Sequence, residues 1–191
     1  MLKKILSLMI VLLPCAMAGA QVVPAARGGA LGNGLRVGGE FSGFAPDFSN
    51  QHLYGIGVYV DYDIKKWVGI EANARFLQFN GYKVTGAPGV LGQNTYAFGP
   101  RFIYNRGRFA PFAKPMFGIA TTTFPDPIIP AYTSDSYFYY SLGGGLDYKL
   151  NRRIALRVEY EQQFWQSFAV EGASGTLTPH GFSVGASYRI F

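Results

Sequence analysis

The sequence predicts an all-β fold, an eight-stranded antiparallel up-and-down transmembrane β-barrel. Eight stretches alternate between apolar and polar or small residues, which puts successive side chains on opposite faces of a strand. The connections between them alternate between tight turns and longer loops, as in outer-membrane barrels. After the N-terminus no run is long and apolar enough for a transmembrane helix. A closed barrel is the remaining way to satisfy every backbone polar group inside a membrane.

The N-terminus predicts export. Lys3 and Lys4 precede the apolar run 5–13, and small residues follow at 16–20. This order is typical of a secretory signal peptide, which we assign to residues 1–20 and expect to be cleaved. The run is shorter than the ~20 residues that span a bilayer. Residues 21–34 form a lead-in rich in glycine and alanine.

Composition excludes several classes of site. Cys15, the only cysteine, lies in the signal, so the exported chain holds no disulfide. Removing the two signal lysines takes the net charge from +6 to about +4, which is mildly basic. We find no phosphate-cradling loop, metal-ligand cluster or nucleic-acid patch, and therefore expect no cofactor and no nucleic-acid partner.

The first three stretches carry bulky apolar side chains on one parity and charged or small ones on the other. The stretches, with their apolar members, are 35–44 (Leu35, Val37, Phe41), 52–63 (Tyr54, Ile56, Val58, Val60, Tyr62) and 67–79 (Val68, Ile70, Ala72, Ala74, Phe76). Each reads as an amphipathic strand.

The fourth and fifth stretches contain prolines. They are 94–104 (Tyr96, Phe98, Phe102, Tyr104) and 109–121 (Phe109, Phe117, Ile119). Pro100 and Pro115 share the apolar parity, and neither can donate a ladder hydrogen bond. We expect a bulge or locally weakened pairing between these two strands.

The sixth and seventh stretches form the clearest hairpin, within residues 136–165. Leu146, Tyr148 and Leu150 share one parity before the turn Asn151-Arg152-Arg153, and Ile154, Leu156, Val158 and Tyr160 share one after it. The eighth stretch is 180–191, with Phe182, Val184, Ala186, Tyr188 and Ile190 on the apolar parity. Together the eight stretches define one barrel domain, residues 35–191.

The connections predict which end faces which compartment. The tight turns are 64–66, 105–108 and 151–153, and the longer loops are 45–51, 80–93, 122–135 and 166–179. Short turns should be periplasmic and long loops extracellular. Aromatic residues gather near strand ends, and those facing outward should form interface girdles. This aromatic set is Tyr62, Trp67, Tyr104, Phe109, residues 137–140, Tyr148 and Trp165.

Side-chain volume decides which face points inward. Eight strands enclose an interior that side chains just fill, so the bulky apolar face should meet lipid. The other parity places a structural charge network in the lumen: Arg36, Glu40, Asp61, Glu71, Arg75, Arg101, Lys114, Asp147, Arg157, Glu159 and Glu161, with Asp63 beside them. Because buried charges must be paired, we expect a salt-bridged plug rather than an open channel. Some of these residues could instead lie hydrated at the rims.

The chain also resembles a known family. The stretch GLDYKLNRRIALRVEYE, the preceding FAPFAKPMFGIA and the closing GFSVGASYRIF resemble the OmpA/OmpX-like outer membrane β-barrel domain over about residues 35–191. The resemblance implies that Phe191 is the terminal aromatic presented to the barrel-assembly machinery. Arg189 departs from the pattern, which has an aromatic there. The periplasmic peptidoglycan-binding domain of full-length OmpA-type proteins is not expected.

These observations predict a non-enzymatic, monomeric outer-membrane protein of a Gram-negative cell envelope, with a structural or surface-interaction (adhesion-like) role. Its partners would be outer-membrane lipids, lipopolysaccharide and the assembly machinery. One alternative is a small lipid-modifying enzyme, but His180 and Ser183 lie on opposite faces of a strand and neither His52 nor His180 has a serine two residues away. The other is a secreted soluble barrel that binds an apolar ligand.

Overall fold

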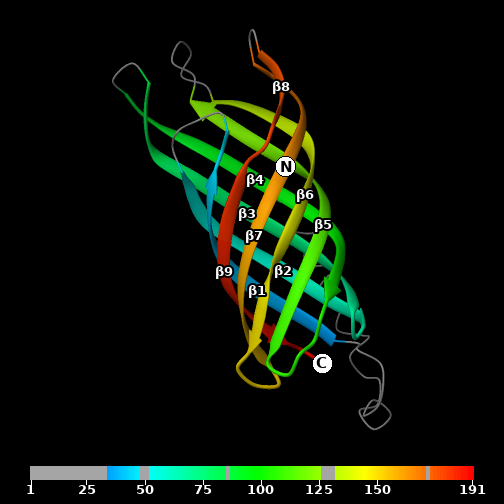
Figure 1. The fold of residues 1–191 in the computed structure, drawn as a ribbon. Coiled ribbons are helices and arrows are strands. Elements are labelled where there is room, and N and C mark those ends of the chain that lie inside the picture. Colours follow the sequence, from blue (N-terminus) through cyan, green and yellow to red (C-terminus); the bar gives the residue numbers. More distant parts are fainter. Residues whose placement is uncertain (1–33, 48–51, 85–86, 126–131, 171–172) are drawn as a thin grey trace, which may run out of the picture. The chain divides into compact units, whose positions relative to one another are not determined.

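The computed structural model describes residues 34–47, 52–84, 87–125, 132–170 and 173–191. These residues form nine antiparallel strands (Figure 1). The strands are β1 (Gly34–Ala45), β2 (Leu53–Lys65), β3 (Val68–Val84), β4 (Ala87–Ile103), β5 (Phe109–Pro125), β6 (Tyr132–Lys149), β7 (Ile154–Val170), β8 (Ala173–Leu177) and β9 (His180–Arg189). Among them no helix is long and apolar enough to cross a membrane.

The sheet closes into a barrel with eight strand positions. Each strand from β1 to β7 pairs with the next, and β9 pairs with both β7 and β1. The short β8 pairs with β7 beyond residue 164, whereas β9 pairs with β7 up to Gln162, so β8 and β9 share the eighth position. The predicted fold class is therefore confirmed: the sheet closes on itself where β9 pairs with β1, and β8, which pairs with β7 alone, lies outside the closed region.

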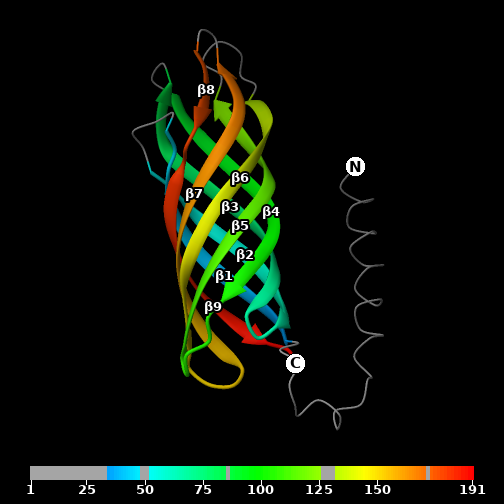
Figure 2. The same ribbon diagram turned by 45° about the vertical axis from the view of Figure 1, so that its right-hand side comes forward.

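The tight connections and the C-terminus lie at one end of the barrel (Figures 1 and 2). The longer connections lie at the other end, the extracellular end of such barrels. Here strands extend into segments predicted as loops: β3 and β4 pair as far as Val84↔Ala87, and β7 continues to Val170. The prediction missed these extensions because strands outside lipid need no apolar alternation, only backbone pairing.

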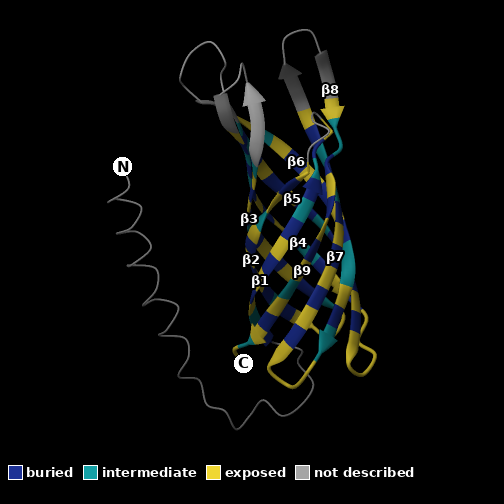
Figure 3. Cartoon of the chain, turned by 90° about the vertical axis from the view of Figure 1, so that its left-hand side faces the viewer, coloured by how far each residue is buried: buried dark blue, intermediate teal, exposed yellow. Residues whose placement is uncertain are grey.

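Burial alternates along the strands (Figure 3). The outward side chains are apolar and large: Phe41, Ile56, Val58, Phe98, Phe117, Ile119, Leu142, Leu156, Val158, Phe182 and Val184 are all exposed. Charged and small residues occupy the inward parity, as in the β1 burial pattern of Glu40 and Ser42 against Phe41. The molecule thus has its apolar surface outside, as a lipid-embedded barrel requires.

The predicted aromatic girdles are only partly outward. Trp67, Tyr104 and Phe109 are exposed near the tight-turn end. Trp165 and Tyr139, by contrast, are fully buried, with ring centroids 6.2 Å apart. They lie on the lumen parity of β7 and β6 and therefore do not belong to the outward girdle.

The prolines interrupt one ladder without changing its register. β4 and β5 pair at Phe98↔Phe117 and again at Phe102↔Ala113, in the same register, but not in between. Pro100 and Pro115 would face each other in this gap. Each pairs normally with its other neighbour, Pro100 with Ile70 and Pro115 with Leu142. The missing donors therefore weaken the β4–β5 pairing alone, and no bulge forms.

Restoring both donors should stabilise the barrel. We expect the Pro100→Val, Pro115→Val double variant to raise the free energy of unfolding by about 1 kcal/mol, since unsatisfied carbonyls in lipid regain partners. Urea unfolding in phospholipid vesicles measures this. Pro111→Val is the control, because Pro111 lies beyond the last β4–β5 pair, Ile103↔Phe112, at the tight-turn end, where water can satisfy the carbonyl that a new donor would reach. A gain as large in the control would contradict the explanation.

Candidate functional site in the barrel lumen

The inward parity brings the predicted charged residues together inside the barrel. Of the eleven positions, all but Arg36 are buried, and Arg36 is half-buried at the tight-turn end. They come from β1 to β7, and every strand in that series contributes at least one of them. Because the strands are tilted, charges from non-adjacent strands meet across the lumen.

Arg157 of β7 is the centre of the network. Its Nη2 lies 2.6 Å from Asp61 Oδ2, its Nη1 2.9 Å from Glu71 Oε2, and its Nε 2.9 Å from Asp147 Oδ1. These carboxylates belong to β2, β3 and β6. One guanidinium thus joins four strands, and its charge-assisted hydrogen bonds use all three nitrogens.

Two further cations complete this group. Arg101 of β4 lies 3.2 Å from Asp61 and also contacts Asp147. Lys114 of β5 contacts Glu71, and its Nζ lies 2.8 Å from Glu159 Oε1. At the mouth, Arg36 pairs with Asp63 at 3.3 Å.

Arg75 forms a second group towards the extracellular end. It lies 3.0 Å from Glu40 and 3.3 Å from Glu161. Glu161 Oε1 accepts a hydrogen bond from Gln163 Nε2 at 2.9 Å, and Gln163 Oε1 accepts one from Trp165 Nε1 at 2.9 Å. A polar ladder thus runs along the inward face of β7 and ends on a buried tryptophan.

Aromatic rings beneath the cations were not predicted. Arg157 lies 4.0 Å from the ring centre of Tyr59, and Arg101 lies 4.4 Å from that of Phe112. Such stacking adds cation–π attraction where water is excluded. Tyr59 can lie in this way because it faces Gly38, where a Cβ would come within 2.2 Å of its ring. Phe112 lies two residues before the inward Lys114 in β5, so the alternation along this strand would have identified it as an inward residue.

Apolar side chains fill the extracellular part of the lumen, which the volume argument had assigned to small and charged residues. One cluster is Phe44, Leu53, Leu77 and Leu91, and the other is Ala97, Met116, Ala120, Tyr139 and Trp165. Arg75 joins the two regions, because its guanidinium lies 4.6 Å from the ring centre of Phe44. The lumen therefore has an apolar layer above a charged layer.

This arrangement offers paired charges rather than reactive ones. Each carboxylate of the network lies beside a cation. His52 and His180 are exposed, and in the described part of the chain neither is hydrogen-bonded to a serine or a carboxylate. Within the same residues, no group of three or more histidine, cysteine or acidic side chains could hold a metal ion. Phe191 is exposed beyond β9.

The comparison with family models agrees with this geometry. The model described as the outer membrane protein beta-barrel domain matches residues 10–189. The chain belongs to this family. No curated protein matches the sequence.

Solved structures of outer-membrane barrels share the fold of this family member. Neisserial surface protein A superposes with a TM-score of 0.63 at 10% identity, over 84% of this chain and 98% of that one. OprG of Pseudomonas aeruginosa gives 0.59 at 13% identity, over 85% and 98%. Ail, the attachment invasion locus protein of Yersinia pestis, gives 0.57 at 15%, over 83% and 97%, in complex with the heparin analogue sucrose octasulfate.

Proposed function

We propose that the protein is an integral outer-membrane barrel with a structural or surface-interaction (adhesion-like) role and a lumen closed by its charge network. In this proposal it is exported by its signal peptide, inserted by the barrel-assembly machinery through Phe191, and surrounded as a monomer by outer-membrane lipids and lipopolysaccharide. The main support is the distribution of side chains, with apolar residues on the outside of the barrel and charged residues inside it. Phe98 and Ile56 are 69% and 67% exposed, whereas Arg75 and Arg157 are buried.

The outward face argues against a soluble barrel that binds an apolar ligand. Such a barrel would turn its apolar parity inward, around a cavity. Here that parity forms a continuous outer surface, and the inward parity holds paired charges. An apolar surface of this extent is far larger than soluble monomers expose.

The filled lumen supports a role other than transport of solutes. Side chains of Arg75, Arg101, Lys114 and Arg157 are at most 1% exposed, so water reaches none of them freely. The apolar layer of Phe44, Leu53, Leu77 and Leu91 lies above them. A solute would have to displace both layers.

A surface role would rest on the extracellular hairpins. β3 with β4, and β7 with β8, continue their pairing beyond the predicted lipid-facing strands. The Yersinia neighbour was solved with a polyanion. In the sequence of this chain, the four connections predicted to be long carry Asp47, Asp126, Asp135 and Glu171 against the single cation Lys83. We therefore expect a neutral or cationic surface partner rather than a polyanion.

Fractionation and conductance test the proposal. The protein should be found in outer-membrane fractions and should change its gel mobility on boiling, as closed barrels do when they unfold. In planar bilayers it should give no large, stable single-channel steps. A periplasmic protein without a mobility shift would contradict the membrane location, and regular steps would contradict the closed lumen.

A further inference from the structure

The periplasmic end of the barrel concentrates positive charge. Nine cationic residues lie on or beside the three tight turns and the ends of their strands: Arg36, Lys65, Lys66, Arg106, Arg108, Lys149, Arg152, Arg153 and Arg189. The acidic residue at this rim, within the described part of the chain, is Asp63, which pairs with Arg36. The lumen network has two more carboxylates than cations, so it offsets only part of this charge, and the rim keeps a positive potential.

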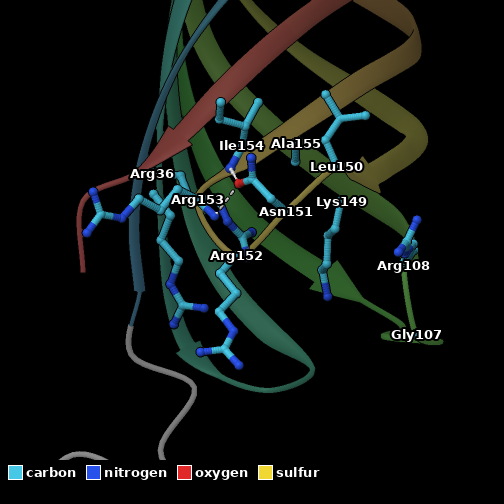
Figure 4. A pocket seen from close by; sticks show the side chains of 11 residues that line it. Arg36, Gly107, Arg108, Lys149, Leu150, Asn151, Arg152, Arg153, Ile154 and Ala155 are labelled. Carbon is cyan, nitrogen blue, oxygen red and sulfur yellow. Dashed lines mark hydrogen bonds between the residues drawn. The ribbon is translucent and has the colours of Figure 1, made fainter.

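Six of these cations line one pocket, of about 460 Å³ (Figure 4). The lining cations are Arg36, Arg108, Lys149, Arg152, Arg153 and Arg189. The β6–β7 turn is fixed by Asn151, whose Oδ1 accepts hydrogen bonds from the backbone N–H groups of Arg153 and Ile154, both at 2.8 Å. This turn presents Arg152 and Arg153 to the pocket on a rigid support.

The pocket holds like charges that an anion would stabilise. Arg36 and Arg189 are direct cross-strand partners, and each has one oxygen partner, Asp63 for Arg36 and the Phe191 backbone oxygen for Arg189. Among the described residues, the side chains of Arg108 and Arg152 make no hydrogen bond or ion pair. Their guanidinium N–H groups are available to a ligand with several acceptor oxygens, such as a phosphate.

The same pocket reaches the lipid-facing surface. Leu150 and Ile154 line it and are exposed on the outside of the barrel. Arg153 Nη1 donates a hydrogen bond to the hydroxyl of Tyr188 at 3.0 Å, and Tyr188 faces outward near the end of β9. An outward tyrosine at a strand end marks the headgroup level of a membrane. The cations thus lie at the depth of lipid phosphates, beside apolar side chains.

We propose that this rim pocket binds the phosphodiester headgroup of an anionic phospholipid in the periplasmic leaflet. Arg152 and Arg153 contact the phosphate, and Leu150 and Ile154 contact the first carbons of the acyl chains. A soluble phosphate would use the cations but not the apolar lining. The inference rests on the membrane location proposed above, which the boiling shift tests separately.

Lipid retention tests the proposal on the full chain folded in dodecyl maltoside. Native mass spectrometry would count bound phosphatidylglycerol against phosphatidylcholine of the same acyl chains. We expect a clear preference for phosphatidylglycerol. Arg152→Gln with Arg153→Gln should weaken its binding on the order of tenfold or more, at about fivefold per cation near a membrane surface. Arg108→Gln, which leaves the Asn151 turn unchanged, should weaken it several-fold.

A matched variant separates this pocket from general charge. Ser134→Asp with Gln166→Glu changes the net charge by the same two units at exposed positions of the extracellular end, and should retain the lipid. Equal retention of both lipids, an equal loss in this control, or displacement by inorganic phosphate at the lipid's own concentration would each overturn the inference. If the wild-type protein folds with a boiling shift but shows no preference, only this inference fails. If it shows no boiling shift, the proposed function fails.

Discussion

Replacing Arg157 by glutamine should lower the free energy of unfolding by about 3–5 kcal/mol, the usual cost of removing one partner from a buried ion network. Arg157 lies within 3 Å of Asp61, Glu71 and Asp147. Without it, these carboxylates share Arg101 and Lys114, which already contact them. The loss would appear as a lower urea midpoint for unfolding in phospholipid vesicles. The boiling-dependent shift in gel mobility would report the folded fraction at each urea concentration.

Three variants isolate the cause. Arg157→Lys keeps the charge but loses the fork that reaches three carboxylates, so we expect an intermediate loss. Val158→Ala changes the neighbouring outward side chain and should cost about 1–2 kcal/mol. Adding Asp61→Asn to Arg157→Gln should recover part of the stability, because one uncompensated charge is removed. If Arg157→Gln cost no more than Val158→Ala, the network would not be a source of stability.

The excess of acid in the lumen makes Arg157 a sensitive position. Seven inward carboxylates, Glu40, Asp61, Asp63, Glu71, Asp147, Glu159 and Glu161, face five inward cations, Arg36, Arg75, Arg101, Lys114 and Arg157. The basic rim lies next to this negative lumen and offsets part of its charge at the mouth. Removing one cation from the centre therefore increases an imbalance that already exists. Replacing a rim arginine such as Arg152 does not leave carboxylates unpaired in this way.

The barrel could be predicted because side chains along a strand alternate between its two faces with a period of two residues. Alternation fixes which residues share a face, and the connection lengths fix the order and direction of the strands. The inward position of Arg157 and Asp61 follows from parity alone. Their contact does not, because β7 and β2 are not neighbours. It depends on strand tilt and on the stagger that closure imposes, which a single sequence does not specify.

Burial of large apolar side chains inside the barrel was harder to predict. The volume argument is correct as an average over the lumen, but the lumen is not uniform. Towards the extracellular end the inward parity carries Leu53, Leu77 and Trp165 in place of charges. Outward residues there are more polar as well, such as Gln78 opposite Tyr54. Where both faces of a strand carry apolar and polar residues, composition no longer distinguishes the inward face from the outward one. The inward residues can then be identified only by counting every second residue from the centre of the strand.

An arginine on the outer face should reveal the membrane directly, through its dependence on depth. Val184 lies at the middle of β9, between Phe41 of β1 and Val158 of β7. Val184→Arg should cost about 2–4 kcal/mol, whereas Ile190→Arg, beyond the periplasmic end of β9, should cost about 0–1 kcal/mol. The two side chains are 53% and 54% exposed, so exposure does not distinguish them. Urea midpoints in vesicles would give both values. Equal costs would mean that the outer face does not cross a bilayer, because the screened repulsion from the neighbouring Arg189 at position 190 is smaller than the cost of placing an arginine in lipid.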